Sequence, residues 1–170
     1  SPLVQMGLFI DYSGIPLAIC LNRGNKNEQK TLIPLEKKIL GDFELAKFVV
    51  CTDAGLSSEE NRKFNNFGER AFVTTVSVKG MAKEIQKWCL EPTGWQLDGE
   101  KERYDIRRLE DTEKDKEKNY GKTYYKQKYI EGYDDDRDIA FNQTLIVTYS
   151  LKYRDYLRHK RNGQIERAQK

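Results

Sequence analysis

Apolar residues in the first ninety positions fall into short clusters separated by polar turns, and their spacing changes from one cluster to the next. Leu3–Asp11 and Ile15–Leu21 are continuous apolar runs rich in Val, Ile, Leu and Phe, and the small polar residues Asp11–Gly14 lie between them. Two such runs around a tight polar turn are typical of a β-hairpin. We therefore expect the chain to open with a pair of antiparallel strands.

Helical and extended segments then alternate as far as residue 90. In Thr31–Leu40 the apolar residues recur at helical spacing, with Thr31 in position to cap the helix and Pro34 in its first turn. Lys47–Cys51 is a short apolar run without alternation, which is typical of a strand covered on both faces. The other predicted elements are the helix Glu59–Phe67, the strand Ala71–Val78 and the helix Met81–Leu90. This order of strands and helices predicts an α/β domain.

The composition changes after Pro92. Glu100–Lys118 holds seven basic and eight acidic side chains and few apolar ones, so we expect an exposed insertion that does not nucleate a core. The elements predicted beyond it are the strands Lys122–Ile130 and Gln143–Ser150 and, from Leu151 onward, a basic helix. Gly163 weakens that helix by about 1 kcal/mol relative to alanine and allows a break. The expected organisation is a core of residues 1–91, a β-rich charged insertion of residues 92–150 and a basic helix of residues 151–170.

Charge and cysteine usage narrow the classes of protein that fit. Thirty Lys and Arg against 27 Asp and Glu give a net charge of +3, so total charge does not predict nucleic-acid binding and its local distribution must decide. Cys20, Cys51 and Cys89 lie far apart and His159 is the single histidine. This spacing argues against a zinc site and favours reduced, buried thiols.

Hydropathy bears on localisation. No apolar stretch reaches the roughly 20 residues that span a bilayer, and no leader with a cleavage site is present. We therefore expect a cytoplasmic protein with no membrane partner. The chain opens in an apolar run and closes within a helical pattern, so we expect it to be an internal part of a longer protein.

Asp53 is the strongest candidate for chemistry, because it lies at the carboxyl end of a predicted strand. Open α/β sheets gather ligands and catalytic groups at such ends. A carboxylate near Gly55, where a substrate backbone can approach, is suited to Mg²⁺ or Mn²⁺, which prefer hard oxygen ligands. The alternative is that Asp53 caps the next turn of the chain, and the sequence leaves both open.

Two segments are candidates for contact with nucleic acid and have structural alternatives. Arg23 and Lys26 lie in a polar loop with Gly24, suited either to DNA phosphates or to a solvated loop before a helix. Lys118–Tyr129 interleaves four lysines with four tyrosines, a composition that suits phosphate and base contacts and also a solvent-facing β-ribbon. The candidate DNA-binding residues in this segment are Lys122, Lys126 and Lys128.

The last helix carries the densest positive charge. Between Lys152 and Lys170 there are seven Lys or Arg and two acids, so we expect this helix to lie near DNA rather than to be merely a soluble helix. The residues assigned to that contact are Lys152, Arg154, Arg158, Lys160 and Arg161.

A series of short motifs occurs in a recognisable order. They are Gly7-Leu-Phe-Ile-Asp11, Gly14-Ile-Pro-Leu17, Gly24-Asn25 with Asn27-Glu28, Thr31-Leu-Ile-Pro34 and Thr52-Asp-Ala-Gly-Leu-Ser57. In order and spacing the series resembles the catalytic domain of DDE transposases from bacterial insertion sequences, in the branch with a β-strand insertion. The resemblance covers roughly residues 2–80, and the later segments Gln143–Ser150, Lys152–Tyr156 and Gln164–Ala168 resemble the part of that domain beyond the insertion.

The resemblance implies a partial ribonuclease-H-like fold, a mixed sheet with flanking helices, interrupted by a β-rich insertion. In this family two Asp and one Glu hold two Mg²⁺ or Mn²⁺ ions, and DNA is cleaved and joined by in-line displacement. Asp53 corresponds to the second acid, the first would lie on a strand before Ser1, and the Glu would lie on a helix beyond Lys170. The implied partners are transposon ends and target DNA at the nucleoid, and the isolated chain is expected to be inactive.

The missing first strand has a structural consequence. It is central in the family's sheet, so the hairpin would have no partner joining it to the strand that ends at Cys51. We expect exposed strand edges that favour rearrangement, a homo-oligomer or contact with neighbouring chains. Asp11 at the hairpin bend is interpreted as a turn residue and not as the first acid.

Two other functions fit the same residues. One is a non-catalytic nucleic-acid-binding or assembly module, in which Asp53 is structural and the basic helix binds. The other is a related metal-dependent nuclease without strand transfer.

Overall fold

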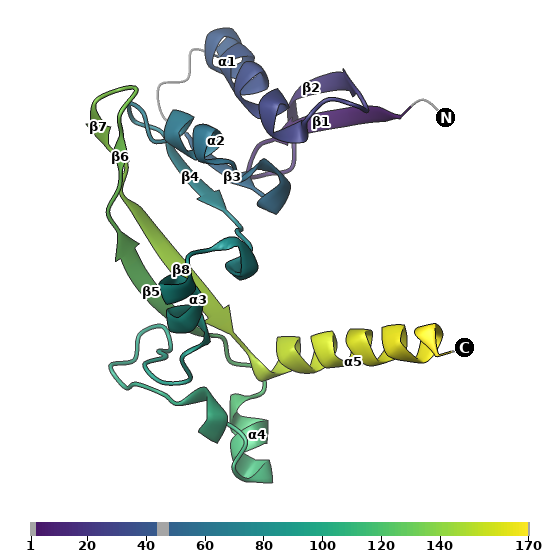
Figure 1. The fold of residues 1–170 in the computed structure, drawn as a ribbon, viewed down its shortest axis with the longest axis vertical. Coiled ribbons are helices and arrows are strands. Elements are labelled where there is room, and N and C mark those ends of the chain that lie inside the picture. Colours follow the sequence, from purple (N-terminus) through teal and green to yellow (C-terminus); the bar gives the residue numbers. More distant parts are fainter. Residues whose placement is uncertain (1–2, 44–47, 170) are drawn as a thin grey trace. The chain divides into compact units, whose positions relative to one another are not determined.

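The computed structural model describes residues 3–43 and 48–169, and the chain is a mixed α/β protein. Its backbone forms two compact units (Figure 1). The first unit contains residues 1–77 and 134–141, and the second contains residues 78–133 and 142–170. The division that the sequence predicts at residues 91 and 150 stays a prediction.

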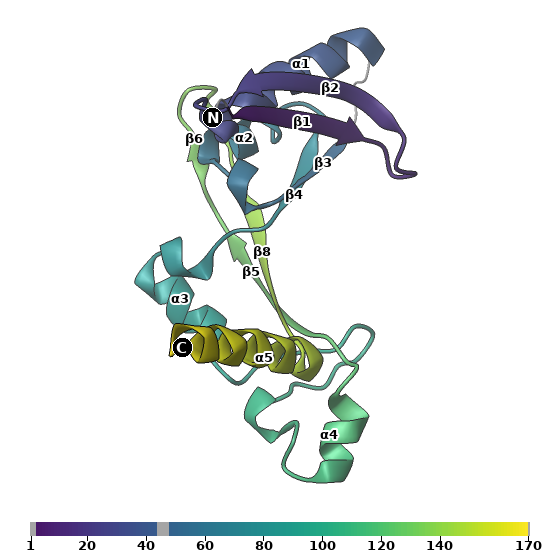
Figure 2. The ribbon, with the colours of Figure 1, turned by 90° about the vertical axis from the view of Figure 1, so that its right-hand side faces the viewer.

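The predicted hairpin is confirmed. Strands β1 (Val4–Ile10) and β2 (Pro16–Arg23) pair antiparallel, and Figure 2 shows them as a long ribbon beside α1. Asp11 is the turn residue expected, because its Oδ1 accepts hydrogen bonds from the backbone N–H groups of Ser13 and Ile15, both at 2.8 Å. Gly14 has a φ of 83°, a conformation that glycine adopts without strain.

The helix α1 (Leu32–Phe43) follows the short 3₁₀ turn η1 (Glu28–Thr31). Asn27 caps this turn, whereas the Thr31 hydroxyl donates to the Glu28 carbonyl within it, so the helix starts one residue later than expected. Leu32, Leu35 and Ile39 form its buried stripe. The helix lies against β2, and a Cβ added at Gly7 would meet Leu35 Cδ2 at 3.7 Å.

Strands β3 (Val49–Thr52) and β4 (Ala71–Thr74) pair in parallel, and α2 (Glu59–Phe64) connects them after the turn η2 (Ala54–Leu56). The prediction that the first of these strands is covered on both faces is wrong. Val50 is buried, but Val49 is 60% and Val73 is 61% exposed, because burial alternates along both strands. Lys47, the predicted start of β3, lies outside the described residues.

Two further element ends, and the burial of the cysteines, differ from expectation. Helix α2 ends at Phe64, because Asn65 leaves the helical conformation with φ −85° and ψ 1°. The strand predicted for Ala71–Val78 ends at Thr74, and η3 (Val78–Gly80) is a 3₁₀ turn. Cys51 is exposed and Cys20 half-buried, so only Cys89 of the three free thiols is buried as predicted.

Among the described residues, the hairpin and the β3–β4 pair are separate two-stranded sheets without hydrogen bonds between them. The hairpin face turned away from α1 is apolar and exposed. Its residues are Val4, Met6, Leu8, Ile10, Ile19 and Leu21, each at least half exposed.

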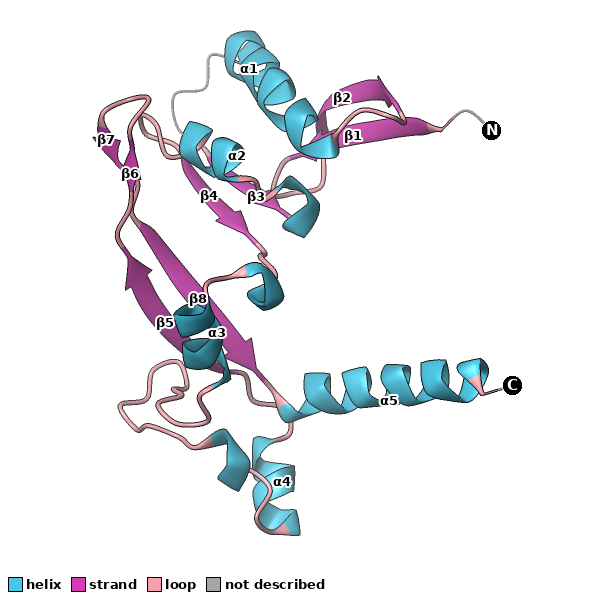
Figure 3. Ribbon diagram, in the orientation of Figure 1, coloured by secondary structure: helices cyan, strands magenta, loops and turns pink. Residues whose placement is uncertain are grey.

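The second unit is built on an antiparallel ribbon of β5 (Tyr124–Ile130) and β8 (Gln143–Tyr149), with α3 (Lys83–Leu90) before it and α5 (Leu151–Ala168) after it (Figure 3). Its core contains Trp95, Leu97, Leu109, Tyr124 and Leu151. Helix α5 continues through Gly163, so the break allowed by that glycine does not occur.

The expectation that Glu100–Lys118 takes no part in a core is wrong. Leu109 is 3% exposed in the core of this unit, and Tyr104 and Ile106 pack against that core. The segment also forms η4 (Ile106–Arg108) and α4 (Glu113–Asn119). Asn119 donates to the Leu109 carbonyl at 3.1 Å and accepts a hydrogen bond from the Tyr124 hydroxyl at 2.8 Å. A few apolar residues suffice because they dock on Trp95 and Tyr124.

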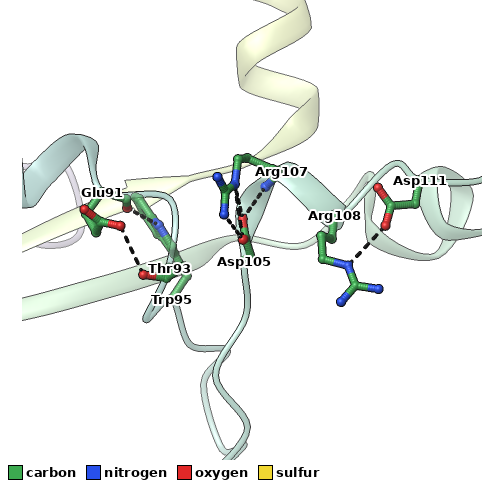
Figure 4. A network of polar contacts seen from close by, with 7 residues as sticks. All are labelled: Glu91, Thr93, Trp95, Asp105, Arg107, Arg108 and Asp111. Carbon is green, nitrogen blue, oxygen red and sulfur yellow. Dashed lines mark hydrogen bonds and ion pairs between the residues drawn. The ribbon is translucent and has the colours of Figure 1, made fainter.

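Local polar contacts shape the chain between residues 91 and 111 (Figure 4). The Trp95 indole N–H donates to the Glu91 carbonyl at 2.9 Å, and the Thr93 hydroxyl donates to the Glu91 carboxylate at 3.2 Å. Hydrogen bonds from the Arg107 side chain and backbone lower the pKa of Asp105 to about 2. Exposed ion pairs of this kind contribute little stability, so they define loop conformation more than they hold the unit together.

Residues 134–141, which lie between β5 and β8 in the chain, belong to the first unit. The short strands β6 (Tyr133–Asp134) and β7 (Ile139–Ala140) pair there, and Phe141 packs against Phe72 with ring centroids 6.4 Å apart. The buried Asp134 accepts a hydrogen bond from Arg137 at 2.7 Å. Within the described part of the chain, no helix is long and apolar enough to cross a membrane.

Candidate functional site

Asp53 is exposed and comes directly after β3, at the carboxyl end of the parallel pair. Its Oδ1 accepts the Gly55 backbone N–H at 3.0 Å, which caps η2. The Thr74 hydroxyl on β4 donates to the Asp53 carbonyl at 3.2 Å. The capping role is therefore present, and the carboxylate also occupies the strand end where open sheets place their ligands.

A second carboxylate faces the same point. A Cβ added at Gly55 would lie 3.2 Å from Asp53 Oδ1 and 3.3 Å from Glu28 Oε2. Both acids thus border the small space that the absent side chain of Gly55 leaves open. Sequence reasoning did not select Glu28 as a site residue, although Asn27-Glu28 is one of the motifs in the transposase-like series.

Asn61 explains why these two acids meet. It is 3% exposed on α2, and its Nδ2 donates to the Gln29 carbonyl and to the Leu56 carbonyl, both at 3.0 Å. Gln29 belongs to η1 and Leu56 to η2, so one amide ties together the two turns that carry Glu28 and Asp53. In the sequence, Asn61 is a polar residue on a short predicted helix, and nothing else there indicates that it joins two turns.

A buried polar network lies next to Asn61, whose two hydrogen bonds clamp η1 to η2. Glu36 on α1 is 0% exposed, and the Asn65 Nδ2 donates to its two carboxylate oxygens at 2.9 and 3.1 Å. The same Nδ2 group donates to the Asn61 carbonyl at 3.2 Å. Burial raises the pKa of Glu36, while the hydrogen bond from Asn65 and the charge of Arg70 oppose that rise. The network joins α1 to α2 beneath the turns.

The donor set fits part of a divalent cation site. Carboxylate oxygens are the ligands that Mg²⁺ prefers, and Asp53 and Glu28 supply them on an accessible surface. Among residues 3–43 and 48–169 no group of three or more His, Cys, Asp or Glu side chains could hold a metal ion. The described residues therefore bring together fewer acids at one place than a two-metal centre requires.

The loop with Arg23 and Lys26 keeps both side chains exposed. Its glycine does not offer a backbone amide to phosphate, because Gly24 N donates to the Leu3 carbonyl at 2.8 Å. A Cβ at Gly24 would lie 2.4 Å from Leu3 Cβ. Gly24 is thus required for close packing of the strand ends, which favours the structural alternative for this glycine.

The lysines of β5 and the turn before it are not equivalent. Lys128 is exposed, Lys122 is half-buried, and Lys126 is 4% exposed. The Lys126 ammonium donates to the Trp88 carbonyl at 2.6 Å and the Glu91 carbonyl at 2.8 Å, and it lies 4.6 Å from the Trp95 ring centroid. Its assignment as a DNA contact is corrected: it satisfies carbonyls at the end of α3.

The basic residues of α5 also divide. Arg154 donates to both carboxylate oxygens of Glu110 and to Asp155, so it joins the helix to the 100–118 segment and is not presented to DNA as predicted. Lys152, Arg158, Lys160 and Arg161 remain exposed. The direction of Arg154 depends on a partner 44 residues away, which spacing along the helix does not reveal.

Comparisons with protein-family models, curated proteins and solved structures give no match for this chain. The resemblance to DDE transposases therefore depends on the short sequence motifs alone, and the residues of the site must carry any functional proposal.

Proposed function

We propose that this chain is the segment of a DNA transposase that carries the second acid of a two-metal centre. The observation that carries the proposal is Asp53, exposed at the carboxyl end of a parallel strand pair beside Gly55 and Glu28. In this proposal the parent protein has a ribonuclease-H-like fold and cleaves and joins DNA phosphodiesters during transposition.

The separated sheets support this proposal. The hairpin and the β3–β4 pair share no hydrogen bonds among the described strands, and each pair has an edge that a further strand can use. A strand inserted there would bring an acid on its carboxyl end toward the side of the sheet where Asp53 lies. That is the position expected for the first acid.

Each residue of the site has a defined role in the proposal. Asp53 holds divalent cations through its carboxylate, and Glu28 supplies a second oxygen ligand or orients a bound water. Asn61 keeps both in register through η1 and η2. Divalent cations held there would supply activation of water or a DNA 3′-hydroxyl and stabilisation of the leaving oxygen. The exposed Lys152, Arg158, Lys160 and Arg161 neutralise phosphates.

A first test measures Mn²⁺ binding to the 170-residue chain by the electron paramagnetic resonance of free Mn²⁺. Asp53→Asn should abolish binding and Glu28→Gln should weaken it. Asp11→Asn is the matched control, because Asp11 is also a carboxylate that accepts backbone N–H groups in a turn. Equal binding by the wild type and Asp53→Asn would contradict the proposal.

A second test measures Mn²⁺-dependent nicking of DNA that contains the element's ends, using the chain together with the flanking parts of its natural coding sequence. Asp53→Ala should abolish nicking. Supplying a cut donor end distinguishes the related nuclease, which would give no joined product.

The second candidate is a non-catalytic nucleic-acid-binding or assembly module. It is favoured by the absence, among the described residues, of three acids or other metal ligands at one place, and by the exposed cations of α5. DNA binding that Asp53→Ala leaves unchanged, with no nicking by the extended protein, would establish this alternative.

A further inference from the structure

Helix α5 has two faces of different chemistry. On the face turned toward its own unit, Leu151 is 0% exposed and Arg154 is held by Glu110. On the other face, Tyr153 is 61% and Tyr156 is 52% exposed. Residues three and four apart lie side by side on a helix, so Tyr153, Tyr156, Leu157 and Lys160 form one continuous outward stripe, which we call the tyrosine stripe.

The aromatic rings of the tyrosine stripe are already aligned. The rings of Tyr153 and Tyr156 have centroids 6.1 Å apart and an interplanar angle of 27°. The Lys160 ammonium lies 5.4 Å from the centroid of the Tyr156 ring. Lys160 lies at one end of the stacked pair, and Tyr153, a residue that is 61% exposed, lies at the other end. An exposed ring face of this kind offers a platform for another flat ring.

The charge around the tyrosine stripe selects the partner. Lys152, Arg158, Lys160 and Arg161 are exposed on the same helix, and Asp155, one of its two acids, is bound to Arg154. An apolar protein surface would have to desolvate these cations, which is costly. A polyanion with flat apolar rings satisfies both features. Duplex DNA presents phosphates but keeps its bases stacked inside, whereas an unpaired strand presents both.

We propose that the tyrosine stripe binds single-stranded DNA, with bases stacked on Tyr153 and Tyr156 and phosphates neutralised by the neighbouring cations. The choice of DNA over other single strands rests on the proposed function. Aromatic stacking tolerates any base, so the stripe reads strandedness and not sequence. The stripe would hold an unpaired DNA end or a displaced strand. A patch of cations without aromatic rings would bind single-stranded and duplex DNA alike.

The test compares binding of a labelled 20-nucleotide oligothymidine and of a duplex of equal length by fluorescence anisotropy, in EDTA. The variant is Tyr153→Leu with Tyr156→Leu, which keeps apolar bulk and helix propensity. We expect about a 10-fold or greater loss of affinity for the single strand, as for removal of other base-stacking rings, and less than about a 2-fold change for the duplex. Tyr12→Leu, in the hairpin turn and 101% exposed, is the matched control and should bind like the wild type.

A second pair of variants separates stacking from charge. Lys160→Gln with Arg161→Gln should weaken binding of both DNAs and reduce the dependence of log K on log salt by about 0.7 per neutralised phosphate for the single strand. The tyrosine variant should leave that slope unchanged. Far-ultraviolet circular dichroism confirms that each variant keeps its helix.

Three outcomes would overturn the proposal. They are an equal loss for single strand and duplex in the tyrosine variant, no loss for either, and a wild-type dimer in sedimentation that the tyrosine variant abolishes. The last would assign the stripe to a second copy of this chain. Because EDTA removes metal, Asp53→Ala must bind the single strand normally, so failure here is distinct from failure of the proposed chemistry.

Discussion

The two long antiparallel pairs of this chain are alike in length and different in completeness. On β1–β2 the face away from α1 exposes Met6, Leu8 and Leu21 at 65, 50 and 69%. On β5–β8, Tyr124 lies in a core with Trp95 and Leu109, and Val147 and Tyr149 pack against that core. The core residues of the second unit cover part of its pair, whereas among the described residues the apolar face of the first pair is left exposed.

The largest expected effect is a loss of stability, and it tests whether each strand pair is covered by a packed core. Leu109→Ala should destabilise the second unit by about 3 kcal/mol, the usual cost of a cavity in a packed core. Leu8→Ala on the open hairpin face should cost less than about 1 kcal/mol, because that side chain is already hydrated. Urea denaturation monitored by tryptophan fluorescence measures the Leu109 effect, since Trp88 and Trp95 both lie in the second unit, and far-ultraviolet circular dichroism of the same samples measures the Leu8 effect in the first unit. A large cost at Leu8 would mean that the hairpin face is covered in solution.

The clamp between η1 and η2 should show the next largest effect. Asn61→Ala leaves the Gln29 and Leu56 carbonyls without their partner, which should cost roughly 2 kcal/mol and weaken Mn²⁺ binding. Asn66→Ala is the control on the same segment, because Asn66 donates to the Ala140 carbonyl and not to either turn. If Asn61→Ala destabilises the unit but binds Mn²⁺ normally, the clamp has no bearing on the site.

Glu36 gives a pH prediction for the first unit. Its pKa is raised above the ordinary value of 4.5 in the folded state by burial. The folded chain therefore holds this proton over a pH range in which the unfolded chain has released it. Stability from this group is greatest below pH 4.5 and is lost as pH rises to the folded pKa.

Glu36→Gln should remove that loss and raise the free energy of unfolding at pH 7 by roughly 1 kcal/mol. The remaining amide oxygen of the variant still accepts a hydrogen bond from Asn65 Nδ2. Denaturation between about pH 4 and 8 checks the slope. An unchanged pH dependence in the variant would assign the slope to other groups.

The smallest expected effect concerns α5. Gly163 meets only Arg167 Nη2 at 4.0 Å from an added Cβ, so alanine fits there. Gly163→Ala should stabilise the helix by up to about 1 kcal/mol and leave single-strand binding unchanged. Helicity by circular dichroism measures the first effect, and a change in DNA affinity would show that the helix bends when it binds.

Residue patterns within short segments predicted most helices and strands, but they did not predict which residues of those segments are buried. The hairpin could be predicted because its turn residues lie between its strands. Asp11 stabilises this turn by accepting a hydrogen bond from Ile15, four residues further along the chain. By contrast, burial of Leu109 depends on Trp95 and Tyr124, and no periodicity in a charged segment indicates such partners.

The site was predicted in part for the same reason. Asp53 could be selected because a strand end is a local feature. Glu28 comes near it because Asn61 donates a hydrogen bond to the carbonyl of Gln29, 32 positions earlier in the chain. Lys126 and Arg154 were assigned to DNA from composition, but each meets partners at long range, on Trp88 and Glu110. Composition indicates how many cations are present and not which of them face solvent.

The way residues 134–141 belong to the first unit has a practical consequence for handling the protein. The backbone passes between the units after residues 77, 133 and 141, and Phe141 and Asp134 are buried where they meet Phe72 and Lys63. A protease cut after Ser77 would therefore sever one connection and still leave both products associated. Because residues 134–141 pack with the first unit, we expect that the parts before and after Ser77 can be made as separate polypeptides and reassembled by mixing.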